Sequence, residues 1–134
     1  TESGCDELVG HDITQTSIQT GNLKTISVGD CITVIGTDAF TGETNLTDVV
    51  LPDTITTIKD VMLHGCTSMH TLTVYSTTPP AFSGTGGANC GLFLGYQPEE
   101  VIPSGFKIKV PSTSVSAYQV ANIWSRYSSI IEAI

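Results

Sequence analysis

The chain has 134 residues, of which 40% are hydrophobic, so it is long enough for a single domain with a buried core. Its net charge of −8, with only five lysines and arginines, argues against binding to nucleic acid or to bare anionic membranes, because such a surface repels phosphate groups. No apolar run is long enough to cross a bilayer, and the chain opens on polar TESGCDE without a signal peptide, so we expect any export leader to be absent from this sequence.

Residues 1–22 contain an incomplete version of a pattern that recurs later in the chain. In ITQTSIQTGNL, Ile13 and Ile18 correspond to Ile35 and Phe40, although this copy is one residue shorter. We therefore expect this segment to form a degenerate repeat that caps the N-terminal end of the domain.

Residues 23–83 contain the repeat itself, with a 23-residue period. The anchors Leu23, Leu46 and Met69 each begin a segment of the form L-x-x-L-x-L, namely LKTISV, LTDVVL and MHTLTV. A single copy buries too little apolar surface to offset the cost of ordering its backbone, whereas stacked copies cover each other's apolar faces. The period therefore predicts an α/β repeat solenoid, a right-handed coil in which equivalent strands form a parallel sheet.

Alternation within the strand of each unit predicts which side chains face the core. In LTDVVL, Val49 and Leu51 should point inward, while Asp48 and Val50 point outward. The ITTI segment that follows is expected to form a second short extended side. The preceding DAFTGETN segment should form a helical turn or a loop that carries a large apolar residue, Phe40, inward.

A glycine-rich insertion, residues 84–105, separates the third strand from the fourth. The fourth strand is predicted in FKIKVP, which begins at Phe106. Ile108 lies further from Leu72 than one 23-residue period, so this unit is longer than the units before it. Glycines form regular structure at a high entropic cost, so we expect a loop here.

The tail, within residues 106–134, is predicted to end the last strand at Pro111 and to continue as a helical cap. Ser112 or Ser114 is suited to the N-cap position. Apolar residues then recur at three- to four-residue steps, with a break near Asn122, as in an amphipathic helix. They are Val115, Tyr118, Ala121, Trp124, Tyr127, Ile130, Ile131 and Ile134. Such a helix covers the open end of the core, and a partner-binding helix is the alternative.

The HGCTSMH segment places three potential metal ligands or nucleophile partners close together, namely His64, Cys66 and His70. The repeat register puts Cys66 at a core position, and no fourth ligand is nearby. We therefore expect a buried structural cysteine, no metal, no cofactor and no catalysis.

The chain has four cysteines, and an even number permits two disulfides with three possible pairings. The spacings match no disulfide scaffold, so the sequence leaves open whether any forms. The cysteines are Cys5, Cys31, Cys66 and Cys90.

The segments VIGTDAFTGETNLTDVVLPDTITTI and HGCTSMHTLTV resemble the 23-residue unit of the BspA-like leucine-rich repeat family. TLTVYSTTPPAF and the C-terminal VPSTSVSAYQVANIWSRYSSIIEAI are also similar to segments of that family, so the resemblance covers residues 13–83 and 105–134. Departures include Glu43, where the family prefers Cys, and VML at 61–63. The resemblance implies a secreted or cell-surface bacterial protein with a binding or adhesion role and no catalysis.

The outward face of the sheet is the predicted binding surface, because side chains one period apart form rows across neighbouring strands. Small polar rows beside an aromatic anchor favour contacts with proteins or sugars. The expected rows are Thr25, Asp48 and Thr71; Ser27, Val50 and Thr73; and Gly29, Pro52 and Tyr75. The predicted binding residues are Asp48, Val50, Thr71, Thr73 and Tyr75.

Three hypotheses for function follow. The first is an extracellular recognition module that binds a protein or a glycan. The second is a structural spacer or terminal domain of a longer surface protein, without a ligand of its own. The third is an enzyme that uses His64, Cys66 and His70. The ligand, the oligomeric state and the mode of anchoring stay open at this stage.

Overall fold

The computed structural model describes residues 7–8, 24–29, 32–36, 40, 42–59, 62–63, 65–82, 92–93 and 102–134, with only the backbone for 7–8. The expected N-terminal repeat over residues 1–22 lies outside these ranges except for the strand β1, Glu7–Leu8. Its pairing sets Leu8 opposite Ile35, so the predicted correspondence of Ile13 with Ile35 is wrong. Most of the glycine-rich insertion, residues 84–105, also lies outside the described ranges.

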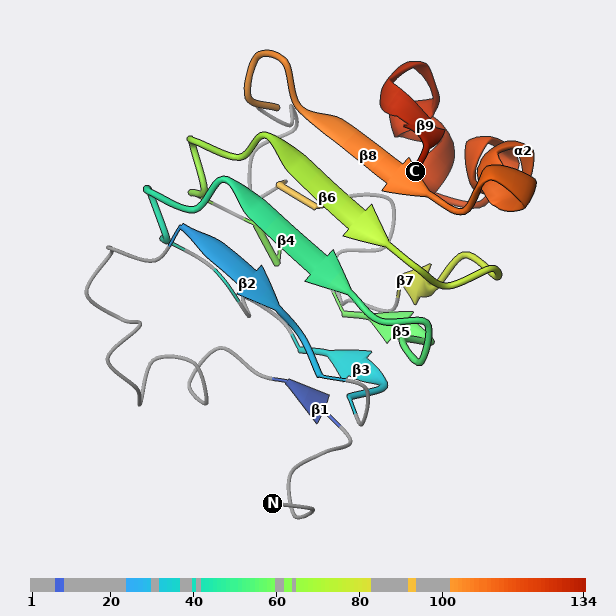
Figure 1. Cartoon of the computed structure of the whole chain (residues 1–134), viewed down its shortest axis with the longest axis horizontal. Coiled ribbons are helices and arrows are strands. Elements are labelled where there is room, and N and C mark those ends of the chain that lie inside the picture. The colour runs from blue at the N-terminus through green and yellow to red at the C-terminus, as the bar shows by residue number, and fades with distance from the viewer. Residues whose placement is uncertain are drawn as a thin grey trace.

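The larger of two sheets is entirely parallel, with the strand order β2-β4-β6-β8-β9 (Figure 1). Its first three strands come from the repeat, β8 follows the insertion, and β9 comes from the C-terminal tail. The strands are β2 (Thr25–Ser27), β4 (Asp48–Leu51), β6 (Thr71–Val74), β8 (Lys107–Val110) and β9 (Ile131–Ala133).

The pairing register of this sheet confirms the repeat period. Thr25 pairs with Asp48, and Asp48 pairs in turn with Thr71. Strand β8 enters the same sheet after the insertion, with Leu72 opposite Ile108, as the longer spacing of this unit predicts. Equivalent positions of successive units therefore lie side by side.

Alternation along each strand follows the prediction. In β4 the side chains of Val49 and Leu51 are completely buried, whereas Asp48 and Val50 are half-buried on the other face. Strand β6 repeats this pattern.

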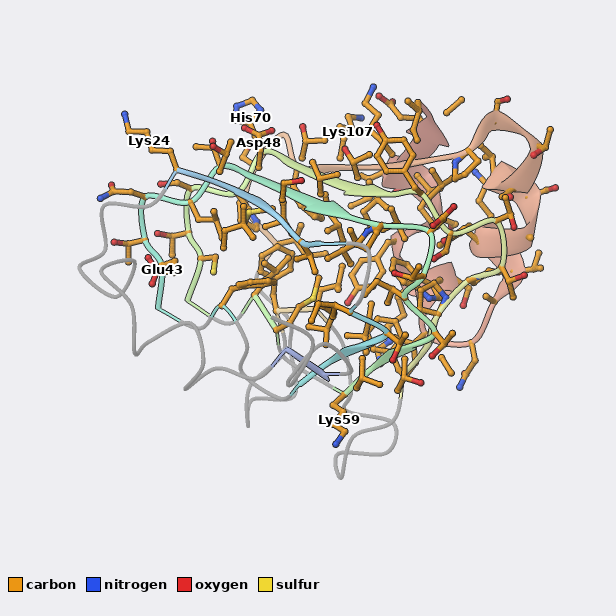
Figure 2. The ribbon with its side chains drawn as sticks, turned by 60° about the horizontal axis from the view of Figure 1, so that its bottom comes forward. Lys24, Glu43, Asp48, Lys59, His70 and Lys107 are labelled. Atoms are coloured by element: carbon orange, nitrogen blue, oxygen red, sulfur yellow. The ribbon has the colours of Figure 1, made fainter. Side chains whose placement is uncertain are left out.

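The smaller sheet is also parallel, with the order β1-β3-β5-β7. It includes the second extended side predicted from ITTI. Its remaining strands are β3 (Val34–Ile35), β5 (Thr57–Ile58) and β7 (Ala81–Phe82). Inward residues of both sheets belong to one apolar cluster, whose side chains fill the space between the ribbons (Figure 2).

Within this cluster the repeat anchors Leu46 and Met69 are both buried, while Leu23 lies outside the described residues. Phe40, which precedes β4, is also buried, as predicted. Phe40 and Leu63 are equivalent positions of two successive units, and the turns that follow them contain Gly42 and Gly65. These two glycines have φ angles of 85° and 82°. Only glycine adopts this left-handed conformation without strain, so both units require a glycine at this turn.

The C-terminal tail departs from the predicted continuous helical cap. After Pro111, a short 3-10 turn (η3, Ser112–Ser114) leads into α2 (Val115–Val120), and a 3-10 segment (η4, Trp124–Ile130) follows. Ile123, with a φ of 71°, lies between α2 and η4 and interrupts the helical conformation.

The prediction was wrong for the last residues, which form β9 and pair with β8 in place of continuing a helix. Ile131 thereby lies opposite Ile108 and is buried, but Ile134 is 56% exposed and does not belong to an apolar stripe. The free edge of a parallel sheet offers hydrogen bonds that the end of a helix would leave unused. Strand pairing therefore decides the conformation here.

Ser114 occupies the N-cap position of α2, but its side chain makes no cap hydrogen bond. Its hydroxyl donates to the carbonyl of Thr77 at 2.8 Å instead. The side chain thus joins the tail to the segment between β6 and β7.

Candidate functional site

The outward face of the larger sheet carries two of the predicted rows. Asp48 and Thr71 lie in the first row, and Val50 and Thr73 lie in the second. The side chains of all four are half-buried. Their rows begin at Thr25 and Ser27 and continue to Lys107 and Lys109 of the fourth strand.

The third predicted row is wrong at Pro52. Pro52 is buried, whereas Gly29 and Tyr75 are exposed, and the Tyr75 side chain is 47% exposed. Strand β4 ends at Leu51, so the in-and-out alternation no longer applies one residue later. Tyr75 therefore lies beside the polar rows without a continuous row of its own, and its amide donates to the Leu51 carbonyl.

The lysines of β8 are part of this face and were not identified from the sequence. Lys107 and Lys109 lie opposite Thr71 and Thr73. The alternation within FKIKVP, with Ile108 and Val110 inward, was the signal that could have placed both lysines outward.

Charges of both signs occur along the sheet face. Lys24, Asp48, His70 and Lys107 lie along the same side of the molecule (Figure 2). The Thr47 hydroxyl donates to the Asp48 carboxylate at 2.8 Å and fixes its orientation.

At the β9 edge, Lys109 forms an ion pair with Glu132. The hydrogen bond and the positive charge of Lys109 lower the pKa of the Glu132 carboxyl. The two charges of this pair cancel, so the row that contains Thr73 and Lys109 has no net charge at that edge.

The HGCTSMH segment does not form a reactive thiol site. Cys66 is 1% exposed and its thiol donates to the Phe40 carbonyl at 3.0 Å. Burial raises the pKa of this thiol to about 11, so the nucleophilic thiolate is scarce at neutral pH. His70 is exposed, and His64 lies outside the described residues. Cys66 is thus a free, buried structural cysteine, while Cys5, Cys31 and Cys90 lie outside the described residues.

Within the described ranges, no three acidic, histidine or cysteine side chains are grouped in a way that could hold a metal ion. The same part of the chain contains no helix of sufficient length and hydropathy to cross a membrane.

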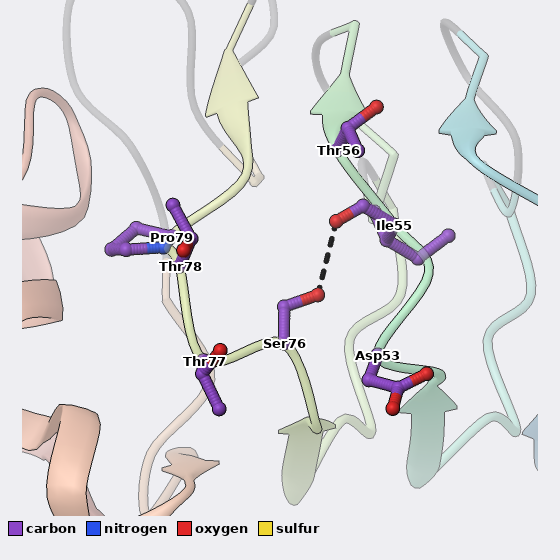
Figure 3. A pocket seen from close by; sticks show the side chains of 7 residues that line it. All are labelled: Asp53, Ile55, Thr56, Ser76, Thr77, Thr78 and Pro79. Atoms are coloured by element: carbon purple, nitrogen blue, oxygen red, sulfur yellow. Dashed lines mark hydrogen bonds between the residues drawn. The ribbon is translucent and has the colours of Figure 1, made fainter.

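A pocket of about 260 Å³ lies at the corner where the chain leaves the larger sheet (Figure 3). One wall is formed by the segment after β4 and the other by the segment after β6. The lining residues are Asp53, Ile55, Thr56, Ser76, Thr77, Thr78 and Pro79. No pattern in the amino-acid sequence indicates this pocket.

Comparison with known proteins gave one family. The sequence model described as "BspA type Leucine rich repeat region (6 copies)" matches residues 11–83, more than half of the 134 residues. No curated protein matches the chain with significant similarity.

Proposed function

Because the chain belongs to the BspA-type leucine-rich repeat family, we propose that it is a secreted or cell-surface recognition module that binds a protein or a glycan. Repeat regions of this type are typical of surface and adhesion proteins and are in general not enzymes. The burial and raised pKa of Cys66 also count against the enzymatic hypothesis.

We further propose that the two parallel sheets are two sides of one right-handed solenoid. The larger sheet pairs Asp48 with Thr71, and the smaller sheet pairs Val34 with Thr57, so both pairings span one repeat period. Two sheets with a shared period and a shared core are what a coiled stack of units requires.

The proposed binding surface is the outward face formed by Asp48, Val50, Thr71, Thr73 and Tyr75. The observation that carries this proposal is the in-register alignment of polar rows beside an exposed aromatic ring. An aromatic ring offers a large contact area at a low cost in side-chain entropy, and the hydroxyls supply hydrogen bonds.

Binding arrays of glycans and surface proteins test this proposal. The wild-type chain should bind at least one ligand, and Thr73→Asp and Tyr75→Ala should each weaken that binding at least tenfold. Thr113→Asp is the matched control, because Thr113 is an exposed threonine of η3 and belongs to no strand of the sheet. Binding that is unchanged in both face variants would contradict the choice of this surface.

A structural spacer is the alternative function. In the described part of the chain, β2 is the first strand of the larger sheet and has one edge without a partner. A further repeat unit could continue the sheet there. The spacer is favoured if no array ligand binds and if a longer parent protein carries a separate binding domain.

A further inference from the structure

The pocket at the corner exists because one unit is a residue longer than its neighbour. Leu51 of β4 pairs with Val74 of β6, and this pairing spans one repeat period. Thr57 of β5 pairs with Ala81 of β7, and this pairing spans one position more than the period. The corner after β6 therefore contains an extra residue and cannot stack flat on the corner after β4.

The longer corner is held in place by the C-terminal tail. The Tyr118 hydroxyl donates to the Ser76 carbonyl at 2.7 Å, and the Trp124 indole N–H donates to the Pro80 carbonyl at 2.8 Å. With the bond from Ser114 to the Thr77 carbonyl, three side chains fix this wall from behind. The wall is thus preorganised, which lowers the entropic cost of binding.

The two walls of the pocket are joined by a hydrogen bond. The Ser76 hydroxyl donates to the Ile55 carbonyl at 3.0 Å, as the dashed line in Figure 3 shows. Both Ser76 and Ile55 are buried. The two walls therefore keep a fixed separation.

The rim offers polar groups that the described residues leave without a partner. Asp53, Thr77 and Thr78 are exposed, and none of their side chains makes a hydrogen bond within the described part of the chain. Ile55 and Pro79 add apolar surface. The described lining residues include one carboxylate and no cationic side chain, so they repel anionic ligands.

We propose that this pocket binds one uncharged sugar ring of a glycan. A carboxylate accepts hydrogen bonds from two neighbouring sugar hydroxyls, threonine hydroxyls both donate and accept, and a proline ring contacts the apolar face of the sugar. Sites for drug-sized ligands are about 300–1,000 Å³, so a pocket of about 260 Å³ suits a single ring. This site is separate from the sheet face proposed above and does not depend on it.

Amide chemical-shift mapping of the full chain tests the proposal. The probes are the methyl glycosides of glucose, galactose, mannose and N-acetylglucosamine at millimolar concentration, with glucuronic acid as the charged comparison. We expect at least one neutral glycoside to shift the amides of Asp53, Thr56 and Ser76 to Thr78, and glucuronic acid to bind more weakly.

Two variants remove polar groups of the rim. Asp53→Asn and Thr78→Val should each weaken binding of the glycoside. Asp53→Asn removes the charged acceptor and should weaken binding by about tenfold. Thr67→Val is the matched control, because Thr67 is an exposed threonine outside both the pocket lining and the sheet face, and it should leave the affinity unchanged. The three positions are exposed, and the amide spectrum of each variant reports directly whether it is folded.

The proposal is overturned if no neutral glycoside shifts these amides, if glucuronic acid binds as well, or if neither rim variant weakens binding. Shifts confined to Thr71, Thr73 and Tyr75 would also overturn it, while supporting the sheet face as the ligand site. The two proposals therefore fail separately.

Discussion

Glu43 and Cys66 occupy the same position of two successive repeat units. Burial is the largest cause of the raised pKa of the Cys66 thiol, and the negative charge of Glu43 also raises it. Cys66 satisfies its thiol with a hydrogen bond to the Phe40 carbonyl. Glu43 is 5% exposed, and its Oε1 atom is buried without a hydrogen-bond partner among the described residues. A position that suits a small, weakly polar side chain thus contains a carboxyl group.

Glu43→Cys should stabilise the protein. Removing a buried carboxyl oxygen that lacks a partner should raise the free energy of unfolding by about 1–3 kcal/mol at neutral pH. Urea unfolding in the presence of a reductant measures this difference. Thr44→Cys, at the neighbouring exposed turn position, controls for the added thiol and should change stability by less than about 0.5 kcal/mol. An equal or lower stability of Glu43→Cys would show that the buried carboxyl group of Glu43 does not destabilise the fold.

The same carboxyl predicts a pH dependence of stability. Burial raises the pKa of Glu43 above 4.5, so protonation favours the folded state. The contribution of Glu43 to the stability of the fold is most favourable below pH 4.5, and this favourable part is lost as the pH rises through the raised pKa of the folded state. The advantage of Glu43→Cys should therefore shrink on acidification, which melting temperatures across the acidic to neutral range can measure. An advantage independent of pH would show that the carboxyl charge is not its cause.

Glu132 predicts a pH dependence of stability with the opposite sign to that of Glu43. Lys109 lowers the pKa of Glu132, so this group stabilises the fold above the ordinary glutamate pKa and ceases to do so as the pH falls through the lowered value. Glu132→Gln should therefore lower the melting temperature slightly at neutral pH and low salt, and the difference should vanish in acid and in high salt. A difference that persists in high salt would point to packing in place of charge.

Tyr118→Phe should loosen the tail from the corner after β6. The substitution removes the hydroxyl that donates to the buried Ser76 carbonyl, which should cost about 1–3 kcal/mol in unfolding free energy. Tyr75→Phe is the control on an exposed tyrosine and should change stability by less than about 0.5 kcal/mol. Equal effects in urea unfolding would mean that the Tyr118 hydroxyl does not hold the corner.

Gly42 and Gly65 form a matched pair for testing the repeat turn. Alanine at either position is strained by about 1–2 kcal/mol, because both have a positive φ. A Cβ at Gly65 would also meet the backbone nitrogen of Gly42 at 3.3 Å, whereas a Cβ at Gly42 meets no atom of the described residues within 4 Å. Gly65→Ala should therefore destabilise the protein more than Gly42→Ala. The reverse order in urea unfolding would show that the stacking of these turns is not close.

The repeat could be predicted because its information is local and is written several times. Apolar residues at equivalent positions, such as Val49 and Leu72, require one register, and a slip of one residue would turn the apolar face outward. The late strand at Ile108 was found for the same reason, since alternation survives the insertion.

The tail and the pocket could not be predicted in this way. The apolar spacing from Val115 to Ile131 suits a helix, yet the last residues pair with β8 because a sheet edge is available there. The number of residues between Val74 and Ala81 shows that the corner after β6 is one residue longer. The YSTTPP segment has no periodic pattern, so the sequence does not indicate where the extra residue lies in space.

The sequence by itself therefore determined the repeat register, the inward and outward positions of each strand, and the family, because these depend on short-range patterns of apolar side chains. Only the tertiary structure decided the strand at the C-terminus, the burial of the Glu43 carboxyl group and the pocket beside Ser76. Segments that are distant in sequence bring together the groups on which these features depend. The hydrogen bonds and the space involved exist only once the units are stacked.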